Sequence, residues 1–207
     1  MRPLPRLHAV TDAATLALPD FGVRAAAIAA AGSAVALHAR DRSAGAPALA
    51  SAAARMVALA GPPEASVIVS ARADIAAAVG AHGVQLASAD LAPGDARRLL
   101  PRGWIGRSVH SAKEAEAAVA EGADFLMAGS VYQTASHPGR AAAGLDLIRG
   151  AAALGVPVIA IGGVTVERGR ELRDAGAWGV AAITALWSAA DPAAAALALL
   201  EPWMEVT

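Results

Sequence analysis

Basic side chains recur at two-residue spacing where one apolar segment ends. His38, Arg40 and Arg42 follow the run S-A-V-A-L, which starts at Ser33. Side chains alternate between the two faces of a strand, so all three would share one face if the strand continues that far. A guanidinium group matches the oxygens of a phosphate and keeps its charge. The spacing therefore predicts a phosphate or diphosphate site, and the alternative is that both arginines are solvated and pair with Asp41.

Two adjacent glycines end another apolar run, V-P-V-I-A-I, which starts at Val156. Glycine adds nothing to the packing of a buried strand, so Gly162 and Gly163 must meet a backbone requirement. That requirement is either a tight turn or the close approach of a ligand. A helix is expected to begin near Thr165, and Thr184 follows the next apolar run. We favour a phosphate site built from main-chain N–H groups at this position.

Two further segments carry groups that could take part in chemistry. The stretch from Gly129 to Leu145 is longer than most strand-to-helix connections, and its Thr134, Ser136 and His137 could contact phosphate oxygens or move a proton. A solvated loop would have the same composition. In I-G-R-S-V-H-S, Ser108 and His110 share one face. His110 precedes Ser111, a candidate helix N-cap, so a structural role for His110 is favoured over catalysis.

The elements that would position these groups form a regular series. Short β-type runs alternate with alanine-rich segments that carry charges at helical spacing, and the runs begin at Leu7, Ser33, Ser66, Gly83, Trp104, Phe125, Pro157 and Gly179. About eight such repeats favour a closed parallel barrel over an open sheet. We therefore expect one α/β domain over residues 1–207, a (β/α)8 TIM barrel. The ends of its strands would meet at a single mouth.

Composition excludes several classes of function. The 207 residues include 17 Lys and Arg against 18 Asp and Glu, with 3% aromatics and no cysteine. Nucleic-acid binding usually needs a basic, stacking surface, which this composition does not supply. The uncharged runs are too short for a bilayer helix, and the N-terminus M-R-P-L-P-R-L-H lacks the apolar segment of an export signal. A cytoplasmic protein with a small-molecule partner is expected, and a homo-oligomer stays open.

Taken together, these motifs resemble the thiamine phosphate synthase and TenI superfamily over nearly the whole chain. The matching stretches are L-H-A-V-T-D, H-A-R-D-R-S, H-G-V-Q-L, I-G-R-S-V-H-S, P-V-I-A-I-G-G-V and G-V-A-A-I-T-A. The resemblance implies a (β/α)8 barrel that binds a thiazole carboxylate or thiazole phosphate. It also implies a phosphate site at Gly162, Gly163, Ile183 and Thr184.

The synthase branch of this superfamily joins hydroxymethylpyrimidine diphosphate to thiazole phosphate and expels diphosphate, using Mg²⁺. Its members carry an Asn-Asp pair after the third strand and an acidic residue after the fourth. Here the pair reads Ser70-Ala71, and only Asp90 matches the second position. The loss of one carboxylate predicts weak Mg²⁺ binding. Ser108, Thr134 and Ser136 match the synthase pattern in character.

The TenI branch is the closer resemblance, because His-x-Arg-x-Arg-Ser and I-G-R-S-V-H-S are typical of it. This branch includes a thiazole tautomerase, which moves a proton without a metal or cofactor. The histidine of the characterised tautomerases falls at Ser130 here. Our first interpretation is a TenI-like tautomerase with Ser130 or His137 as the acid/base group. His38, Arg40, Arg42, Ser108, Thr134 and Ser136 would bind substrate.

Two alternatives remain open at this point. The first is a thiamine phosphate synthase that uses Mg²⁺ held in part by Asp90. The second is a non-catalytic protein that binds thiazole phosphate or has a regulatory role.

Overall fold

The computed structural model describes residues 3–61, 64–134 and 142–204. Its strands are β1 (Leu7–Val10), β2 (Val35–Ala39), β3 (Ser66–Ser70), β4 (Gly83–Leu86), β5 (Trp104–Val109), β6 (Phe125–Gly129), β7 (Val158–Ile161) and β8 (Gly179–Ala182). Its α-helices are α1 (Ala13–Leu16), α2 (Phe21–Ala29), α3 (Ala46–Leu59), α4 (Ala73–Val79), α5 (Pro93–Leu99), α6 (Ala112–Ala120), α7 (Gly144–Ala152), α8 (Gly169–Asp174), α9 (Thr184–Trp187) and α10 (Pro192–Leu200). Two 3-10 turns, η1 (Gly32–Ala34) and η2 (Glu201–Trp203), complete the elements.

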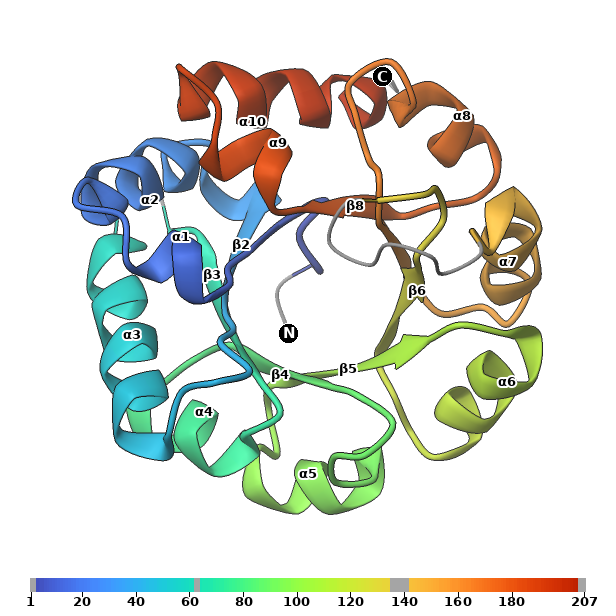
Figure 1. Ribbon diagram of the computed structural model, residues 1–207. Coiled ribbons are helices and arrows are strands. Elements are labelled where there is room, and N and C mark those ends of the chain that lie inside the picture. Colours follow the sequence, from blue (N-terminus) through green and yellow to red (C-terminus); the bar gives the residue numbers. More distant parts are fainter. Residues whose placement is uncertain (1–2, 62–63, 135–141, 205–207) are drawn as a thin grey trace.

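The eight strands form one closed barrel in chain order. Every neighbouring pair is parallel, and β8 pairs back with β1 through Leu7 and Val180. The helices surround the barrel as an outer ring (Figure 1). The expected (β/α)8 barrel is thus confirmed, and the carboxyl ends of all eight strands lie at one mouth.

One expected boundary is wrong. The helix after β7 begins at Gly169, four residues after the expected start at Thr165. The intervening residues form turns, in which Arg168 N donates to Thr165 O at 3.3 Å and Gly169 N donates to Val166 O at 3.1 Å. Thr165 and Val166 are β-branched and enter helices reluctantly, which fits the later start.

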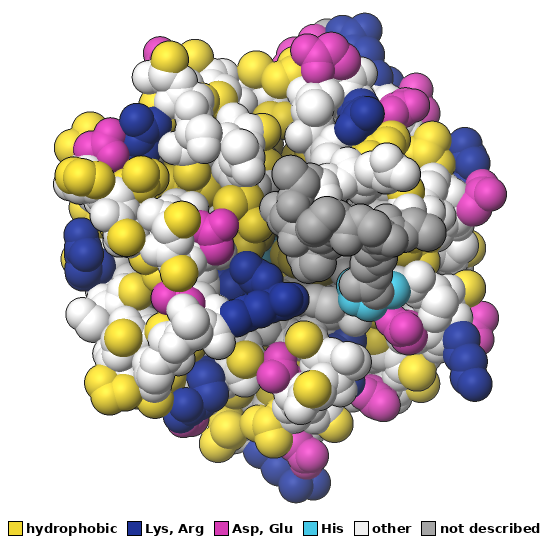
Figure 2. Space-filling model, in the orientation of Figure 1, with side chains coloured by type: hydrophobic (Ala, Val, Ile, Leu, Met, Phe, Trp, Pro, Cys, Tyr) yellow, Lys and Arg dark blue, Asp and Glu magenta, His cyan; other side chains and the backbone are white. Residues whose placement is uncertain are grey.

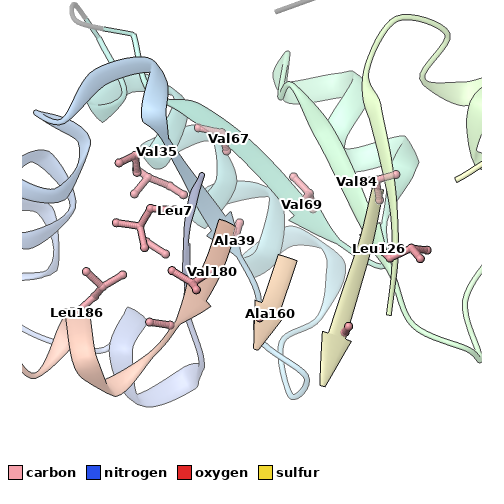
Figure 3. Close-up of a cluster of buried hydrophobic side chains, with 14 of the residues drawn as sticks. Leu7, Val35, Ala39, Val67, Val69, Val84, Leu126, Ala160, Val180 and Leu186 are labelled. Carbon is pink, nitrogen blue, oxygen red and sulfur yellow. The ribbon is translucent and has the colours of Figure 1, made fainter. Parts of the chain in front are cut away.

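Apolar side chains pack in two separate layers because neighbouring residues of a strand face opposite sides. Val67 and Val69 of β3 join the layer between the sheet and the helices, whereas Ile68 joins the cluster inside the barrel. Figure 3 shows part of the outer layer, with Leu7, Val35 and Val67 from adjoining strands. Inside the barrel, Phe125 and Ile159 are fully buried. Burial of each such side chain stabilises the fold by about 1.5–3 kcal/mol.

Within the described ranges, no helix combines the length and the apolar character needed to cross a bilayer.

Candidate active site

A cavity of about 640 Å³ opens at the carboxyl ends of the strands. It is lined by the last residues of β1 to β8 and by the loops that follow them. Figure 2 shows the corresponding face, where Lys and Arg side chains gather near the centre. In a barrel of this kind the strand-end loops carry the chemistry, so this cavity is the candidate active site.

The structure brings together most of the residues that the sequence singled out. Those that line the cavity are His38, Arg40, Arg42, Asp90, Ser108, His110, Ser130, Thr134, Gly162, Gly163, Ile183 and Thr184. Ser136 and His137 fall outside the described residues, so their predicted roles stay predictions. The cavity thus combines arginines, hydroxyl groups and a glycine corner.

Thr11 fixes the end of β2, from which two of the predicted binding residues extend. Its hydroxyl oxygen lies 2.9 Å from the carbonyl oxygen of His38 and 3.0 Å from that of Arg40. The same oxygen accepts a hydrogen bond from Arg40 N at 3.0 Å. These bonds hold the backbone beyond the last residue of the strand, which keeps His38 and Arg40 on the cavity side.

The two arginines at this end are available to an anion. Neither Arg40 nor Arg42 forms an ion pair with a described residue. Asp41, the alternative partner, instead accepts hydrogen bonds from Ser43 N at 2.8 Å and from its hydroxyl at 2.6 Å. Burial and the neighbouring charge of Arg42 lower the pKa of Arg40, and Asp12 and Asp41 oppose this shift. An anion bound beside both guanidinium groups would relieve their mutual repulsion.

Three buried polar atoms on β2 to β4 have no partner among the described residues: His38 Nδ1, Ser70 Oγ and Gln85 Oε1. All three residues line the cavity, and Ser70 is paired with Gln85 in the sheet register. Buried polar atoms are nearly always hydrogen-bonded, so these three indicate contacts with a ligand or with water. Sequence reasoning assigned no binding role to Ser70 or Gln85, although each is a polar residue at the end of an apolar strand.

The fifth strand divides its side chains as the alternation predicts. Ser108 and His110 line the cavity, whereas Arg107 donates to the carbonyl groups of Ala87 at 2.9 Å and Leu91 at 3.0 Å. His110 is held on both sides, because its backbone N donates to Glu114 Oε2 at 2.8 Å and its Nδ1 bonds the carbonyl of Gly129. The structural role predicted for His110 agrees with these contacts.

The predicted N-cap at the start of α6 is confirmed. The Ser111 hydroxyl accepts a hydrogen bond from Glu114 N at 3.2 Å. This bond satisfies one of the N–H groups that a helix start leaves without a partner.

The glycine corner after β7 has a structural cause of its own. Gly162 and Gly163 have φ values of +98° and +67°, in the region that favours glycine. A Cβ atom on Gly162 would lie 2.6 Å from Ser130 Cβ, and one on Gly163 would lie 2.7 Å from Tyr132 Cβ. The turn and its packing on the loop after β6 therefore require both glycines without any ligand. Their contact with a phosphate remains a proposal.

Ser130 was the first candidate for an acid/base group. It lies next to the glycine corner and lines the cavity. No described histidine, aspartate or glutamate forms a hydrogen bond with its hydroxyl. A serine hydroxyl is a poor base without such a partner. The described residues therefore do not form a proton-transfer site at this position.

The side chains of the described residues also do not form a magnesium site by themselves. Asp90 lines the cavity, and one of its carboxylate oxygens accepts a hydrogen bond from Ala87 N at 2.6 Å. Asp74, the first acidic residue after β3, forms an ion pair with Arg72. No group of three His, Asp or Glu side chains within the described ranges could hold a metal ion. A single carboxylate supplies few of the oxygen ligands that Mg²⁺ needs, and we assign no step of the reaction to a metal.

Comparisons with known proteins agree on one family. The family profile described as thiamine monophosphate synthase matches residues 7–186. A thiamine-phosphate synthase of Thermus thermophilus is 42% identical over 149 residues, which are 71% of this chain and 72% of that protein. A thiamine-phosphate synthase of Mycolicibacterium gilvum is 46% identical over 132 residues, which are 63% of this chain but only 56% of that protein.

Solved structures give the same result over the full length. A thiamine phosphate pyrophosphorylase from Pyrococcus furiosus is 31% identical, with a TM-score of 0.83, and the match covers 99% of this chain and 98% of that chain. A 3-hexulose-6-phosphate synthase at 23% identity shares the barrel fold alone, with a TM-score of 0.69. From the profile match and these relatives, the chain belongs to the thiamine monophosphate synthase family.

Proposed function

We propose that this protein is a thiamine phosphate synthase. The observation that carries this proposal is the similarity to proteins named thiamine-phosphate synthase. It is combined with a cavity that has, on one side, two arginines without an ion-pair partner among the described residues and, on the other, a glycine corner. The tautomerase interpretation has less support, because these relatives are synthases by name and Ser130 has no described partner that would activate it.

The proposed reaction forms one bond and breaks one. The ring nitrogen of thiazole phosphate attacks the methylene carbon of hydroxymethylpyrimidine diphosphate with its lone pair. The C–O bond to diphosphate breaks, and diphosphate leaves with the electron pair. The attacking nitrogen carries no proton, so the thiazolium product forms without a general base. That no described residue activates Ser130 as a base is therefore compatible with this reaction.

The main task of the protein is then to hold two anions in line and to stabilise the leaving group. Arg40 and Arg42 would hold the diphosphate, where their positive charges offset the negative charge that builds up as the C–O bond breaks. Main-chain groups around Gly162 and Gly163, together with Ile183 and Thr184, would hold the phosphate of the thiazole. Fixing both reactants in one cavity removes much of the entropic cost of a bimolecular reaction.

The experiment supplies the purified full chain with both substrates and quantifies thiamine phosphate and diphosphate. We expect equal amounts of the two products, and a rate at least about tenfold lower for Arg40→Ala. Parallel reactions with EDTA and with Mg²⁺ determine the metal requirement. A lack of thiamine phosphate under both conditions would overturn the proposal.

A parallel assay tests the tautomerase interpretation. The unaromatised carboxythiazole phosphate is supplied alone, and its isomerisation is followed. We expect the uncatalysed rate, because Ser130 has no described partner that could take up a proton. Acceleration here without synthase activity would reinstate the tautomerase.

A further inference from the structure

A second buried histidine lies behind His38, inside the barrel. His8 belongs to β1, and its side chain packs against His38 and Phe125 with ring-centroid distances of 4.9 Å and 5.6 Å. His8 Nδ1 lies 2.7 Å from His38 Nε2, and His8 Nε2 lies 3.1 Å from the carbonyl oxygen of Pro5. His8 is 0% exposed and His38 is 1% exposed. The pair therefore forms a buried chain of hydrogen bonds that runs from Pro5 to His38, a residue that lines the cavity.

The position of each proton in this chain follows from the contact with Pro5. A carbonyl oxygen only accepts, so His8 Nε2 must carry the proton and donate. Burial lowers the pKa of His8 to about 4, which leaves a neutral ring with a single N–H at neutral pH. His8 Nδ1 is then an acceptor, and His38 Nε2 must donate to it. The opposite tautomer of His38 would place two lone pairs 2.7 Å apart.

The second nitrogen of His38 is fixed by the same logic. Burial, together with the neighbouring His8 and Arg40, lowers the pKa of His38 well below its usual value, so this ring is also neutral. Since Nε2 carries its only proton, Nδ1 carries a lone pair. Nδ1 is buried without a described partner, and His38 lines the cavity. An N–H group of a ligand that approached Nδ1 would therefore meet a hydrogen-bond acceptor.

A second buried acceptor without a described partner, Gln85 Oε1, lies inside the barrel beside Gly106 and Phe125. Gln85 Nε2 lies 3.0 Å from the Ser108 hydroxyl and 3.4 Å from the carbonyl oxygen of Leu86, which can only accept. These contacts orient the amide so that Oε1 is the atom left without a partner. Gln85 Oε1 therefore lies against β5 and the barrel interior, and His38 Nδ1 is the acceptor on which ligand selection depends.

We propose that His8 is a positioning residue that locks His38 in the tautomer whose Nδ1 accepts a hydrogen bond from a ligand N–H group. This lock selects an amino-substituted nitrogen heterocycle and rejects one that presents a carbonyl oxygen at the same place. An oxo group would bring a lone pair against the lone pair of Nδ1 at a buried position, which is a strong penalty. The identity of the ligand as a pyrimidine diphosphate rests on the proposed function.

The tautomer can be read in the free protein without any substrate. In full-length protein with ¹⁵N-labelled histidine, nuclear magnetic resonance should show His38 with a protonated Nε2 and an unprotonated Nδ1, the signals being assigned by their loss in His38→Gln. In His8→Phe, which keeps a ring but removes the acceptor, we expect His38 to lose its fixed tautomer and to populate both neutral forms. In His8→Asn, whose Oδ1 can replace the Nδ1 acceptor, the wild-type tautomer should return. A protonated His38 Nδ1 in the wild type would overturn the proposal.

Calorimetry tests selection with three probes: an aminopyrimidine diphosphate, its oxo counterpart and thiazole phosphate. The wild type and His8→Asn should bind the amino compound at least about tenfold more tightly than the oxo compound, which corresponds to the loss of one good hydrogen bond. His8→Phe should lose this preference while its affinity for thiazole phosphate stays unchanged. Retention of the full preference in His8→Phe would contradict the proposal.

The outcomes separate this proposal from the proposed function. If His8→Phe fails to fold, its binding of thiazole phosphate also disappears. The proposal is then tested by the His38 tautomer in the wild type and in His8→Asn. If the tautomer and the preference are as expected but no thiamine phosphate forms, only the proposed function fails.

Discussion

The two sides of the cavity would bind their ligands by different chemical means. On the side of β2 to β4, side chains would carry the recognition, and His38, Arg40, Arg42, Ser70 and Gln85 line it. On the side of β6 to β8, main-chain groups around Gly162 and Gly163 would do so. Substitutions on the first side can change charge or hydrogen bonding while the backbone stays in place. The second side depends on two glycines whose positive φ angles and close contacts with Ser130 and Tyr132 act together against a Cβ atom.

This difference indicates where the chain can vary and still fold. Ser70 and Ala71 stand where the synthase pattern has Asn and Asp, and the strands around them keep their register. Gly162 has no such freedom, because positive φ and close contact with Ser130 act together. The side-chain half should therefore determine which leaving group and metal are used. The main-chain half should determine whether a phosphate site exists at all.

The largest expected effect comes from Gly162→Ala. The new Cβ would meet Ser130 at 2.6 Å, and φ of +98° is strained for alanine. We expect a loss of about 3 kcal/mol in the free energy of unfolding, which corresponds to a melting temperature lower by roughly 6–12 °C. Gly150→Ala is the matched control, because Gly150 lies in α7 with nothing within 4 Å of the added Cβ. Equal melting temperatures for the two variants would show that the corner is not constrained.

The next effect is the loss of diphosphate affinity in Arg40→Ala. Removing one charged hydrogen-bond donor from a half-buried site should weaken the binding of inorganic diphosphate about 30-fold, as measured by calorimetry. The diphosphate affinity of Arg40→Lys should fall between those of the wild type and Arg40→Ala, since lysine keeps the charge but lacks the planar guanidinium fork. Arg98→Ala serves as the control, because that side chain is 82% exposed on α5. If Arg40→Ala binds diphosphate as well as Arg98→Ala does, the anion lies elsewhere.

A smaller effect should follow from restoring a carboxylate with Ala71→Asp. Ala71 has φ of +66°, where Asp and Asn are tolerated better than Ala, and it lines the same cavity as Asp90. A second carboxylate should tighten Mg²⁺ binding about tenfold in calorimetry. Ala71→Asn provides the same backbone preference without the charge and should leave Mg²⁺ affinity unchanged. Equal Mg²⁺ affinity in both variants would mean that this position does not face the metal.

The smallest expected effect concerns Asp74→Asn. Asp74 holds Arg72, which lines the cavity, through a 2.8 Å contact between Arg72 Nε and Asp74 Oδ1. The hydrogen bond from Arg72 lowers the pKa of Asp74 from 3.8 to about 2, so the pair contributes above about pH 4 and is lost as the pH falls toward 2. At neutral pH the substitution should release Arg72 and raise diphosphate affinity about two- to threefold. The pair is exposed, so unfolding should become easier by less than about 1 kcal/mol. Unchanged affinity for diphosphate would show that Arg72 does not reach the anion.

The barrel could be predicted from the sequence because its signals are local and repeated. The strands are short apolar runs, and several of the helices between them, such as α6 and α8, carry charges at helical spacing. The convergence of His38, Arg40 and Arg42 on one cavity also followed from alternation along a single strand. Local patterns of this kind need no knowledge of which distant residues meet.

The remaining features depend on contacts between distant segments, which no local pattern contains. His8 looked like part of an ordinary first strand, and its bond to His38 appears only when β1 and β2 are paired. The glycine pair suggested a ligand, but its clash partner Ser130 lies on the loop after β6, 32 residues earlier. The start of α8 was placed too early because apolar and charged residues at 164–168 fit a helix as well as a turn.

A crystal structure of the protein with thiamine phosphate and diphosphate bound tests the central claim most directly. The account predicts diphosphate against Arg40 and Arg42, and the phosphate of thiamine phosphate at the Gly162-Gly163 corner. Diphosphate in the glycine corner, or a product bound outside the 640 Å³ cavity, would contradict it.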